Sequence, residues 1–232
     1  AGPLMRELPR AMFAVHPDGA RHMIDPSKLE ASARAVYGAD YDCHHGLLEP
    51  IPESRVCRID DGQVIDLAGR ALRCVHTPGH ARHHLSVWDA RSRSWFAGDT
   101  FGISYRELDS ARGAFIVPST SPVQFDPVAL RASIRRLLAE APEAVFVTHY
   151  GRVTGVQELG TRLIAQIDGM VDLARRSNGS PDRHQRLVTG LARKYTANAQ
   201  RQGIVDTDEV VRLLEMDIEL NAQGLGVWLD RQ

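Results

Sequence analysis

The segment TPGHARHH, residues 77–84, carries the clearest chemical signal in this chain. It directly follows a β-prone run, Ala71 to His76, and its proline and glycine indicate a turn. A side chain at the end of a strand is held rigidly, while the turn after it leaves that side chain open to a ligand. His80 is therefore the first candidate functional residue.

Two later segments repeat this arrangement. GDT at residues 98–100 follows the β-prone run Ser94 to Ala97, and THYG at residues 148–151 follows the run Ala144 to Thr148. Strand ends from distant parts of a chain can meet at one site. The side chains that we expect to converge are those of His80, Asp99 and His149. Imidazole and carboxylate together suit zinc, iron(II) or manganese(II).

Together the three segments resemble the second, third and last metal motifs of the metallo-β-lactamase-fold hydrolases, the superfamily that holds glyoxalase II and the acyl-homoserine lactonases. The resemblance implies an α/β fold, the αββα sandwich. It also implies that His80 ligates one metal, Asp99 bridges two and His149 ligates the second. It covers about residues 1–152, and the helical region 153–232 resembles the variable C-terminal extension of some members.

The chain departs from that family in one respect. Members carry an HxHxDH signature after an early strand, and nothing in this sequence matches it. His44 and His45 are adjacent, so in a strand they would face opposite ways. His16 and His22 lie six residues apart with no acid–histidine pair between them. Because residues 1–8 resemble the helix that follows the signature, we expect the N-terminal strands and half the metal site to be missing from this chain.

The resemblance implies a metal-dependent hydrolase that attacks an ester-like bond, such as a thioester or a lactone. Two divalent ions, zinc first with iron or manganese as alternatives, would lower the pKa of a shared water toward ~7 and polarise the substrate carbonyl. Asp99 would hold the ions, and Tyr150 would donate to the oxyanion, unless it only packs on its strand. His83 and His84 are candidates for supporting the ligands rather than for ligation.

Two other functions stay open. A mononuclear iron dioxygenase acting on persulfides would use ligands like His80 and Asp99, and would contain one iron and consume oxygen. A truncated member of the fold could instead bind without catalysing a reaction.

Composition and charge limit the kinds of molecule that we expect this chain to bind. The 232 residues are 43% hydrophobic, and 28 basic against 29 acidic residues leave a net charge of -1, so no global field attracts nucleic acid or an anionic membrane. No apolar run reaches the roughly 18 residues of a membrane span. Basic residues between Arg175 and Lys194 lack interleaved aromatics, which favours a solvated surface. We expect a small-molecule substrate, no nucleic acid, no membrane, and a homodimer as one use of the apolar face between Val210 and Ile218.

Three cysteines, Cys43, Cys57 and Cys74, show no CxxC spacing, which favours free thiols and a cytoplasmic location. The local pattern also predicts a turn at Asp18-Gly19, a hairpin at Asp61-Gly62 and an irregular loop over residues 101–124 with a short strand at 115–117. The remaining predicted strands cover residues 12–15, 54–59, 63–67 and 85–88. The predicted helices cover residues 28–37, 126–142, 156–176, 182–199 and 207–221.

Overall fold

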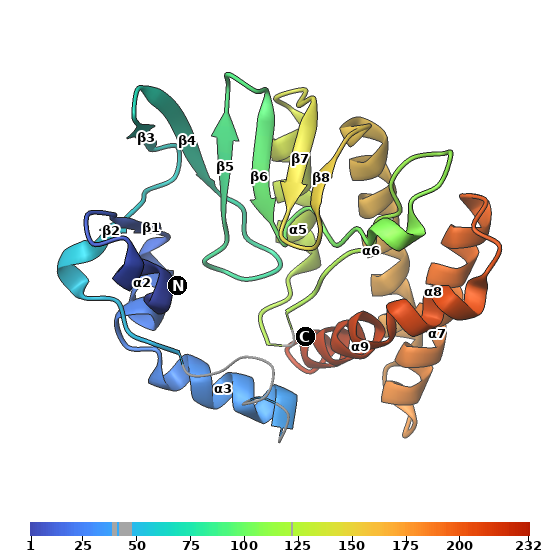
Figure 1. The fold of residues 1–232 in the computed structure, drawn as a ribbon. Coiled ribbons are helices and arrows are strands. Elements are labelled where there is room, and N and C mark those ends of the chain that lie inside the picture. The colour runs from blue at the N-terminus through green and yellow to red at the C-terminus, as the bar shows by residue number, and fades with distance from the viewer. Residues whose placement is uncertain (39–40, 42–47, 122) are drawn as a thin grey trace. The chain divides into compact units, whose positions relative to one another are not determined.

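The computed structural model describes residues 1–38, 41, 48–121 and 123–232 (Figure 1). Contacts divide the chain into two compact units, residues 1–63 and residues 64–232. Cys43 and the pair His44-His45 lie outside the described residues. Cys57 and Cys74 are free thiols, as predicted, and Cys74 is buried. The expected boundary near residue 152 stays a prediction.

The first unit is built on a short parallel strand pair. Its described elements are α1 (Gly2–Glu7), β1 (Phe13–Val15), α2 (Pro17–Ile24), α3 (Ser27–Tyr37), the 3-10 turn η2 (Glu53–Arg55) and β2 (Val56–Arg58). Ala14 pairs with Cys57 in the centre of the two strands. The predicted strand at 12–15 and the predicted helix at 28–37 are thus confirmed.

Helix α2 corrects the predicted turn at Asp18-Gly19. Pro17 stands at the first helical position, where its missing N–H removes no hydrogen bond. The Nδ1 atom of His16 accepts the backbone N–H of Asp18 at 3.1 Å and so caps the helix. The turn prediction was wrong because a proline that ends one strand can also begin a helix.

The second unit contains a six-stranded sheet in sequential order. Its strands are β3 (Val64–Leu67), β4 (Arg70–His76), β5 (Leu85–Asp89), β6 (Ser94–Gly98), β7 (Ala144–Val147) and β8 (Gly151–Val153). Neighbouring strands are antiparallel except β6 and β7, which are parallel. The sequence predicted the first five of these strands and missed β8, whose three residues follow β7 after a tight turn.

The predicted hairpin at Asp61-Gly62 was also wrong. The strand before it, β2, pairs with β1 in the other sheet. The first hairpin of the large sheet joins β3 to β4 instead, through Ala68 and Gly69, whose φ angles are 52° and 83°. Two consecutive positive φ values match the twist of a two-residue hairpin, and alanine at the first position hid this turn from the sequence analysis.

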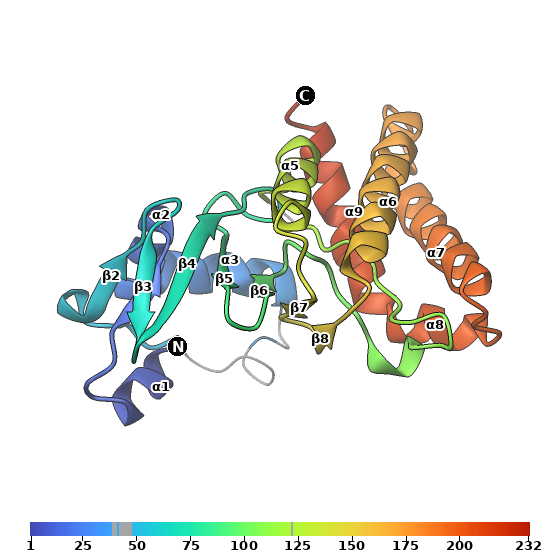
Figure 2. The ribbon, with the colours of Figure 1, turned by 90° about the horizontal axis from the view of Figure 1, so that it is seen from above.

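Helices cover one face of this sheet, as Figure 2 shows for α5 (Pro127–Leu138) and α6 (Val156–Ser177). Trp95 faces these helices, is 1% exposed, and its Nε1 donates to the carbonyl oxygen of Leu137 at 3.0 Å. Alternate residues face the other way. On that second face Phe96 stacks on Phe146 at 4.9 Å between ring centroids, and Phe96 is 47% exposed.

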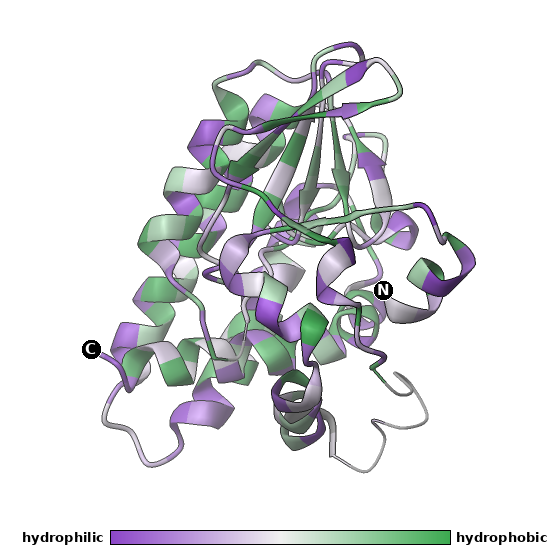
Figure 3. Ribbon diagram, turned by 90° about the vertical axis from the view of Figure 1, so that its left-hand side faces the viewer, coloured by the Kyte–Doolittle hydropathy of each residue, from purple (hydrophilic) through white to green (hydrophobic). Residues whose placement is uncertain are grey.

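The C-terminal region is helical, as predicted. After α6 come α7 (Arg183–Arg201), α8 (Thr207–Leu213) and α9 (Glu215–Leu229), so the helix predicted over 207–221 is two helices that meet at Leu214. Hydrophilic and hydrophobic stretches alternate along the helices of this unit (Figure 3). Within the described residues, no helix is both long and apolar enough to cross a membrane.

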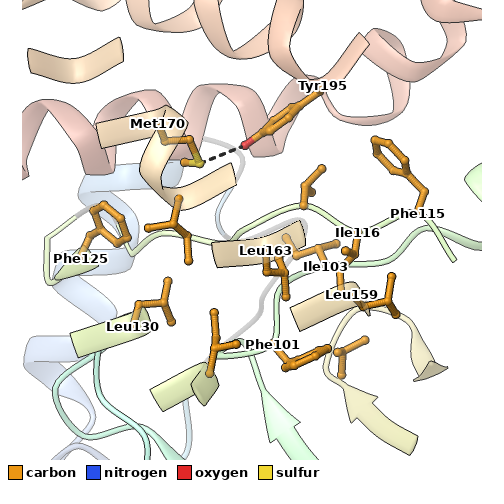
Figure 4. Packing of buried hydrophobic residues seen from close by; sticks show 14 of the residues in the cluster. Phe101, Ile103, Phe115, Ile116, Phe125, Leu130, Leu159, Leu163, Met170 and Tyr195 are labelled. Carbon is orange, nitrogen blue, oxygen red and sulfur yellow. Dashed lines mark hydrogen bonds between the residues drawn. The ribbon is translucent and has the colours of Figure 1, made fainter. Parts of the chain in front are cut away.

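A long loop joins β6 to α5 and enters the core. Its described part holds the short turn η3 (Arg106–Leu108) and a bridge between Ile103 and Val117, where the sequence predicted a short strand. Phe101, Phe115 and Phe125 of this loop are nearly fully buried beside residues of α5 and α6 (Figure 4). The loop is irregular, as predicted, but it is fixed by its own aromatic side chains.

Candidate metal centre

Three strand ends lie at one edge of the large sheet. Strands β4, β6 and β7 run in the same direction, because β4 and β6 are both antiparallel to β5 and β7 is parallel to β6. The residues that follow them are therefore at the same edge. These are the segments that carry His80, Asp99 and His149.

The structure brings the three predicted side chains together. The Nε2 atom of His149 lies 3.4 Å from Oδ1 of Asp99, and the Nε2 atom of His80 lies 3.8 Å from Oδ2 of the same carboxylate. The side chains of Asp99 and His80 are 26% and 19% exposed, and that of His149 is 47% exposed. One carboxylate thus stands between two imidazoles at a partly open edge. Ligation by these residues stays a prediction.

The TPG part of the first motif fastens its loop to α5. Gly79 has φ 133°, and a Cβ there would lie 2.3 Å from the backbone of Leu130, so only glycine fits. Its carbonyl oxygen accepts the N–H of Asp126 at 2.8 Å, and the side chain of Asp126 caps α5. The hydroxyl of Ser133 donates to the carbonyl oxygen of Pro78 at 2.7 Å. His80 therefore begins from a fixed backbone.

His84, at the end of the same segment, supports the cluster. Its Nε2 accepts the backbone N–H of Asp99 at 3.0 Å, so the ring proton is on Nδ1, which lies 2.8 Å from the hydroxyl of Thr77 and 3.0 Å from that of Thr100. Burial, followed by the charge of His80, lowers the pKa of His84 to about 4. A neutral ring at physiological pH can accept the bond that orients Asp99.

The GDT motif fits around this ring. Gly98 has φ 53°, and a Cβ there would lie 2.5 Å from Nε2 of His84. Thr100 donates its hydroxyl to the carbonyl oxygen of Thr77 at 3.0 Å. The glycine thus admits the imidazole, and the threonine joins the β6 loop to the β4 loop. The motif is a structural support for Asp99 as well as its carrier.

The orientation of His80 is set from the long loop. Its Nδ1 lies 3.2 Å from the carbonyl oxygen of Ser119, which can only accept, so Nδ1 carries the proton and Nε2, which faces Asp99, has a free lone pair. Asn221 of α9 holds this loop on both sides of Ser119. Its Oδ1 accepts the N–H of Thr120 at 2.8 Å, and its Nδ2 donates to the carbonyl oxygen of Pro118 at 2.9 Å. Asn221 is not among the site residues predicted from the sequence.

The groups around Asp99 favour its charged form. Burial alone would raise the pKa of Asp99, but its hydrogen bond with His149 and its interactions with the imidazoles of His80 and His84 outweigh burial and lower it. The pKa of His149 is raised, mainly by Asp99. The carboxylate therefore stays charged and attracts cations to this edge.

Tyr150 lies beside the cluster and not within it. Its ring centroid is 5.9 Å from that of His149 and 4.9 Å from that of Tyr105, and the residue is 50% exposed. Tyr105 donates its hydroxyl at 2.8 Å to Asp217 of α9, a carboxylate 8% exposed whose pKa is raised by burial. The sequence analysis missed Asp217, whose only signal is an acidic residue in an apolar helix.

The donor set suits a divalent cation. Two donors about 2.1 Å from one ion at a tetrahedral angle lie roughly 3.4 Å apart, which matches His149 and Asp99, while His80 lies slightly farther away. Its Nε2 is nevertheless in the tautomer that ligation needs. Among the described residues, no group of three histidine, cysteine or acidic side chains is arranged to hold an ion by itself. The fit therefore rests on donor type, tautomer and pairwise spacing.

Known sequences place the chain in a family. The sequence model of the metallo-beta-lactamase superfamily matches residues 4–149. A metallo-beta-lactamase fold-containing protein of Sulfurisphaera tokodaii is 32% identical over 127 residues, which are 55% of this chain and 45% of that protein. An atrochrysone carboxyl ACP thioesterase of Paecilomyces divaricatus is 35% identical over 60 residues, 26% of this chain and 19% of that protein. The matches thus span less than half the length of these relatives.

Solved structures share the fold of this chain. An archaeal metallo-beta-lactamase superfamily protein from Sulfolobus tokodaii has a TM-score of 0.64 and 23% identity, covering 96% of this chain and 73% of that chain. A metallo-beta-lactamase family protein from Thermus thermophilus has a TM-score of 0.57 and 19% identity, covering 93% and 69%. The fold predicted from the three strand-end motifs is confirmed. The chain belongs to the metallo-beta-lactamase superfamily.

Proposed function

We propose that this protein is a metal-dependent hydrolase that cleaves an ester-like bond, with a thioester as the first candidate and a lactone as the second. The observation that carries this proposal is the arrangement of Asp99 between the Nε2 atoms of His80 and His149 at 3.8 and 3.4 Å. The superfamily includes hydrolases, and a shared carboxylate flanked by imidazoles is a donor set for a hydrolytic divalent metal site.

Each side chain has a distinct part in this proposal. His80 and His149 would each hold one of two divalent ions, with zinc as the first candidate, and Asp99 would contact both. Bound ions would supply an acidified water as nucleophile and polarise the substrate carbonyl. Tyr150, half exposed beside His149, would donate its hydroxyl to the oxyanion that develops on the substrate.

The thioester is placed first because of one relative. The fungal protein that matches 26% of this chain is an ACP thioesterase by name. Its match is short, so the preference over a lactone depends on a direct comparison of substrates.

The test measures metal content and hydrolysis on the same preparations. The purified protein is loaded with zinc, iron(II) or manganese(II), and bound metal is measured by mass spectrometry. Hydrolysis is followed with a short acyl thioester, by release of thiol, and with an acyl-homoserine lactone. The variants His80→Ala and His149→Ala are compared with His184→Ala, because His184 is an exposed histidine paired with Glu219, away from the cluster.

We expect both cluster variants to lose bound metal and at least about 100-fold in hydrolysis, consistent with the contribution of general catalytic groups. His184→Ala should behave as the unchanged protein. Metal content that is equal in all three variants would remove His80 and His149 from the ligand set. Metal binding without hydrolysis of either substrate would favour a binding protein, and one iron with oxygen consumption on a persulfide would favour the dioxygenase.

A further inference from the structure

A cavity lies between α6 and α7, and it does not include the side chains of the metal centre. Its volume is about 850 Å³, within the range of small-molecule sites. Residues 162–176 of α6 and 190–202 of α7 form its two walls, and Phe115 and Ile116 of the long loop complete it. None of its lining residues belongs to the candidate metal centre.

The charges of this cavity, which we call the α6–α7 groove, are all of one sign. Its charged lining side chains are Arg162, Arg176, Arg193, Lys194 and Arg201, and no carboxylate of the described residues lines it. Arg162 pairs with Glu158, and Arg201 bonds to Asn198. The other three form no ion pair within the described part of the chain. In a protein of net charge -1, this concentration of unpaired cations creates a local field that attracts anions.

The floor of the groove is largely apolar, with a few polar atoms of Tyr195 and Gln166. Phe115, Ile116, Met170 and Tyr195 line it, and Figure 4 shows the hydroxyl of Tyr195 directed to the sulfur of Met170, 3.8 Å away. Gln166 also lines the groove. Its Nε2 donates to the carbonyl oxygen of Ile116 at 2.9 Å, while its Oε1 is buried and has no hydrogen-bond partner among the described residues.

Gly169 makes room for one of the cations. A Cβ at this position of α6 would lie 2.9 Å from the Nζ atom of Lys194. The ammonium group of this partly buried lysine therefore lies close to the backbone of α6. Glycine in a helix interior is unfavourable by roughly 0.5–1 kcal/mol relative to alanine, so this position gives up helix stability where the lysine enters.

We propose that the α6–α7 groove binds a small molecule that carries a phosphate group on a flat apolar body. Arginine and lysine donors match phosphate oxygens, and the apolar floor matches the body. Nucleic acid is the less suitable anion, because a cavity of about 850 Å³ between two helices has the size of a small-molecule site.

The test uses calorimetric titration of the whole protein with naphthyl phosphate, inorganic pyrophosphate and a single-stranded oligonucleotide at low salt. Arg193→Glu changes a groove cation, and Arg175→Glu is the matched control, because Arg175 is an exposed neighbour on α6 that does not line the groove. We expect Arg193→Glu to weaken naphthyl phosphate binding at least about tenfold, as for a charged hydrogen bond, and Arg175→Glu to leave it within twofold.

A second variant, Ala165→Trp, fills the groove without changing its charge. It should abolish naphthyl phosphate binding and leave pyrophosphate binding within twofold, and its melting temperature shows whether the protein is folded. The proposal is overturned if naphthyl phosphate does not bind at millimolar concentration, or if Arg193→Glu and Arg175→Glu weaken it equally. Oligonucleotide binding that Arg193→Glu abolishes, with naphthyl phosphate unaffected, would assign the groove to nucleic acid.

Discussion

The six-stranded sheet and the helix pair α6–α7 differ in whether their charged side chains have partners of opposite charge. At the sheet two carboxylates have partners: the partly exposed Asp99 lies between two imidazoles at one edge, and the buried Asp89 accepts from Arg70 at the opposite edge. In the groove Arg193 and Lys194 have no acidic partner among the described residues. Paired charges hold a geometry in place, whereas unpaired cations keep their attraction for an incoming anion.

The surroundings of one glycine in each region show that the two regions also differ in rigidity. At the strand-end cluster a Cβ on Gly79 would meet the backbone of Leu130 at 2.3 Å, which cannot move without moving α5. In the groove a Cβ on Gly169 would meet the end of the Lys194 side chain at 2.9 Å, which can rotate away. The first region is rigid around its site, and the second is adaptable.

The largest expected effect comes from Gly79→Ala. A left-handed φ and a collision with backbone each carry a cost, so we expect the free energy of unfolding to fall by about 4 kcal/mol or more. His80 is the next residue, so metal binding should fall as well. Denaturant unfolding and metal content measure the two effects.

The control for that change is Gly69→Ala in the β3–β4 hairpin. Gly69 also has a positive φ, 83°, but beyond its two chain neighbours no atom of the described residues lies within 4 Å of its Cβ position. It should lose only about 1–2 kcal/mol, the penalty of the left-handed conformation. Equal losses in the two variants would mean that the contact with Leu130 does not restrain the loop, and the sheet edge would not be the rigid region.

The next effect in size is expected from Asn221→Ala. This change leaves the N–H of Thr120 and the carbonyl oxygen of Pro118 buried without their partner, which should lower the free energy of unfolding by about 3 kcal/mol. Ser119 lies between them and orients His80. Metal affinity should therefore fall too, measured by competition with a chelating dye.

Tyr195→Phe distinguishes the effect on the free energy of unfolding from the effect on metal affinity. It removes the bond from Nδ2 of Asn221 to the hydroxyl of Tyr195, 2.8 Å long, but keeps both bonds to the loop. We expect a loss of about 1 kcal/mol and unchanged metal affinity. Were Tyr195→Phe to weaken metal binding as much as Asn221→Ala, the loop around Ser119 would not be what positions His80.

A smaller effect, with a pH dependence, is expected at the opposite sheet edge. The pKa of Asp89 is held well below its ordinary value near 3.8, first by Arg70 and then by the hydroxyl of Ser92 and the N–H of Arg91. A lowered carboxyl pKa stabilises the folded state above the unfolded pKa, and this contribution is lost as the pH falls through the folded pKa. Asp89→Asn should therefore lower the melting temperature at pH 5–8.

The difference between Asp89→Asn and the unchanged protein should be constant over that range and shrink below about pH 4. Asp172→Asn is the control, since Asp172 is exposed and pairs with no cation within the described residues, and its melting temperature should follow the unchanged protein. A difference that grows as the pH falls would contradict the pairing of Asp89 with Arg70.

The strand-end cluster could be predicted from the sequence because each member has a local signal. His80, Asp99 and His149 each follow a β-prone run and precede a turn, and both patterns depend only on neighbouring residues. Asn221 and Asp217 could not be predicted, because their partners are about a hundred residues away and polar residues in an apolar helix have no distinctive spacing.

The same limit applies to the rest of the fold. The periodicity of the sequence predicted the long helices and the β-branched strands. It did not predict β8, because the three residues Gly151–Val153 are too few to show a periodic pattern. The sequence predicts a solvated surface for the basic residues of α6 and α7. Only the packing of the two helices brings Arg176 and Arg193 to one groove.

The smallest expected effect, and of opposite sign, comes from Gly169→Ala in the groove. Alanine is a better helix former than glycine by roughly 0.5–1 kcal/mol, and the side chain of Lys194 can move away from the new methyl group. Denaturant unfolding should show a slight gain in stability, while naphthyl phosphate binding weakens severalfold because the ammonium is displaced. A loss of stability comparable to that of Gly79→Ala would show that the groove is as rigid as the sheet edge, and the contrast between the two regions would not hold.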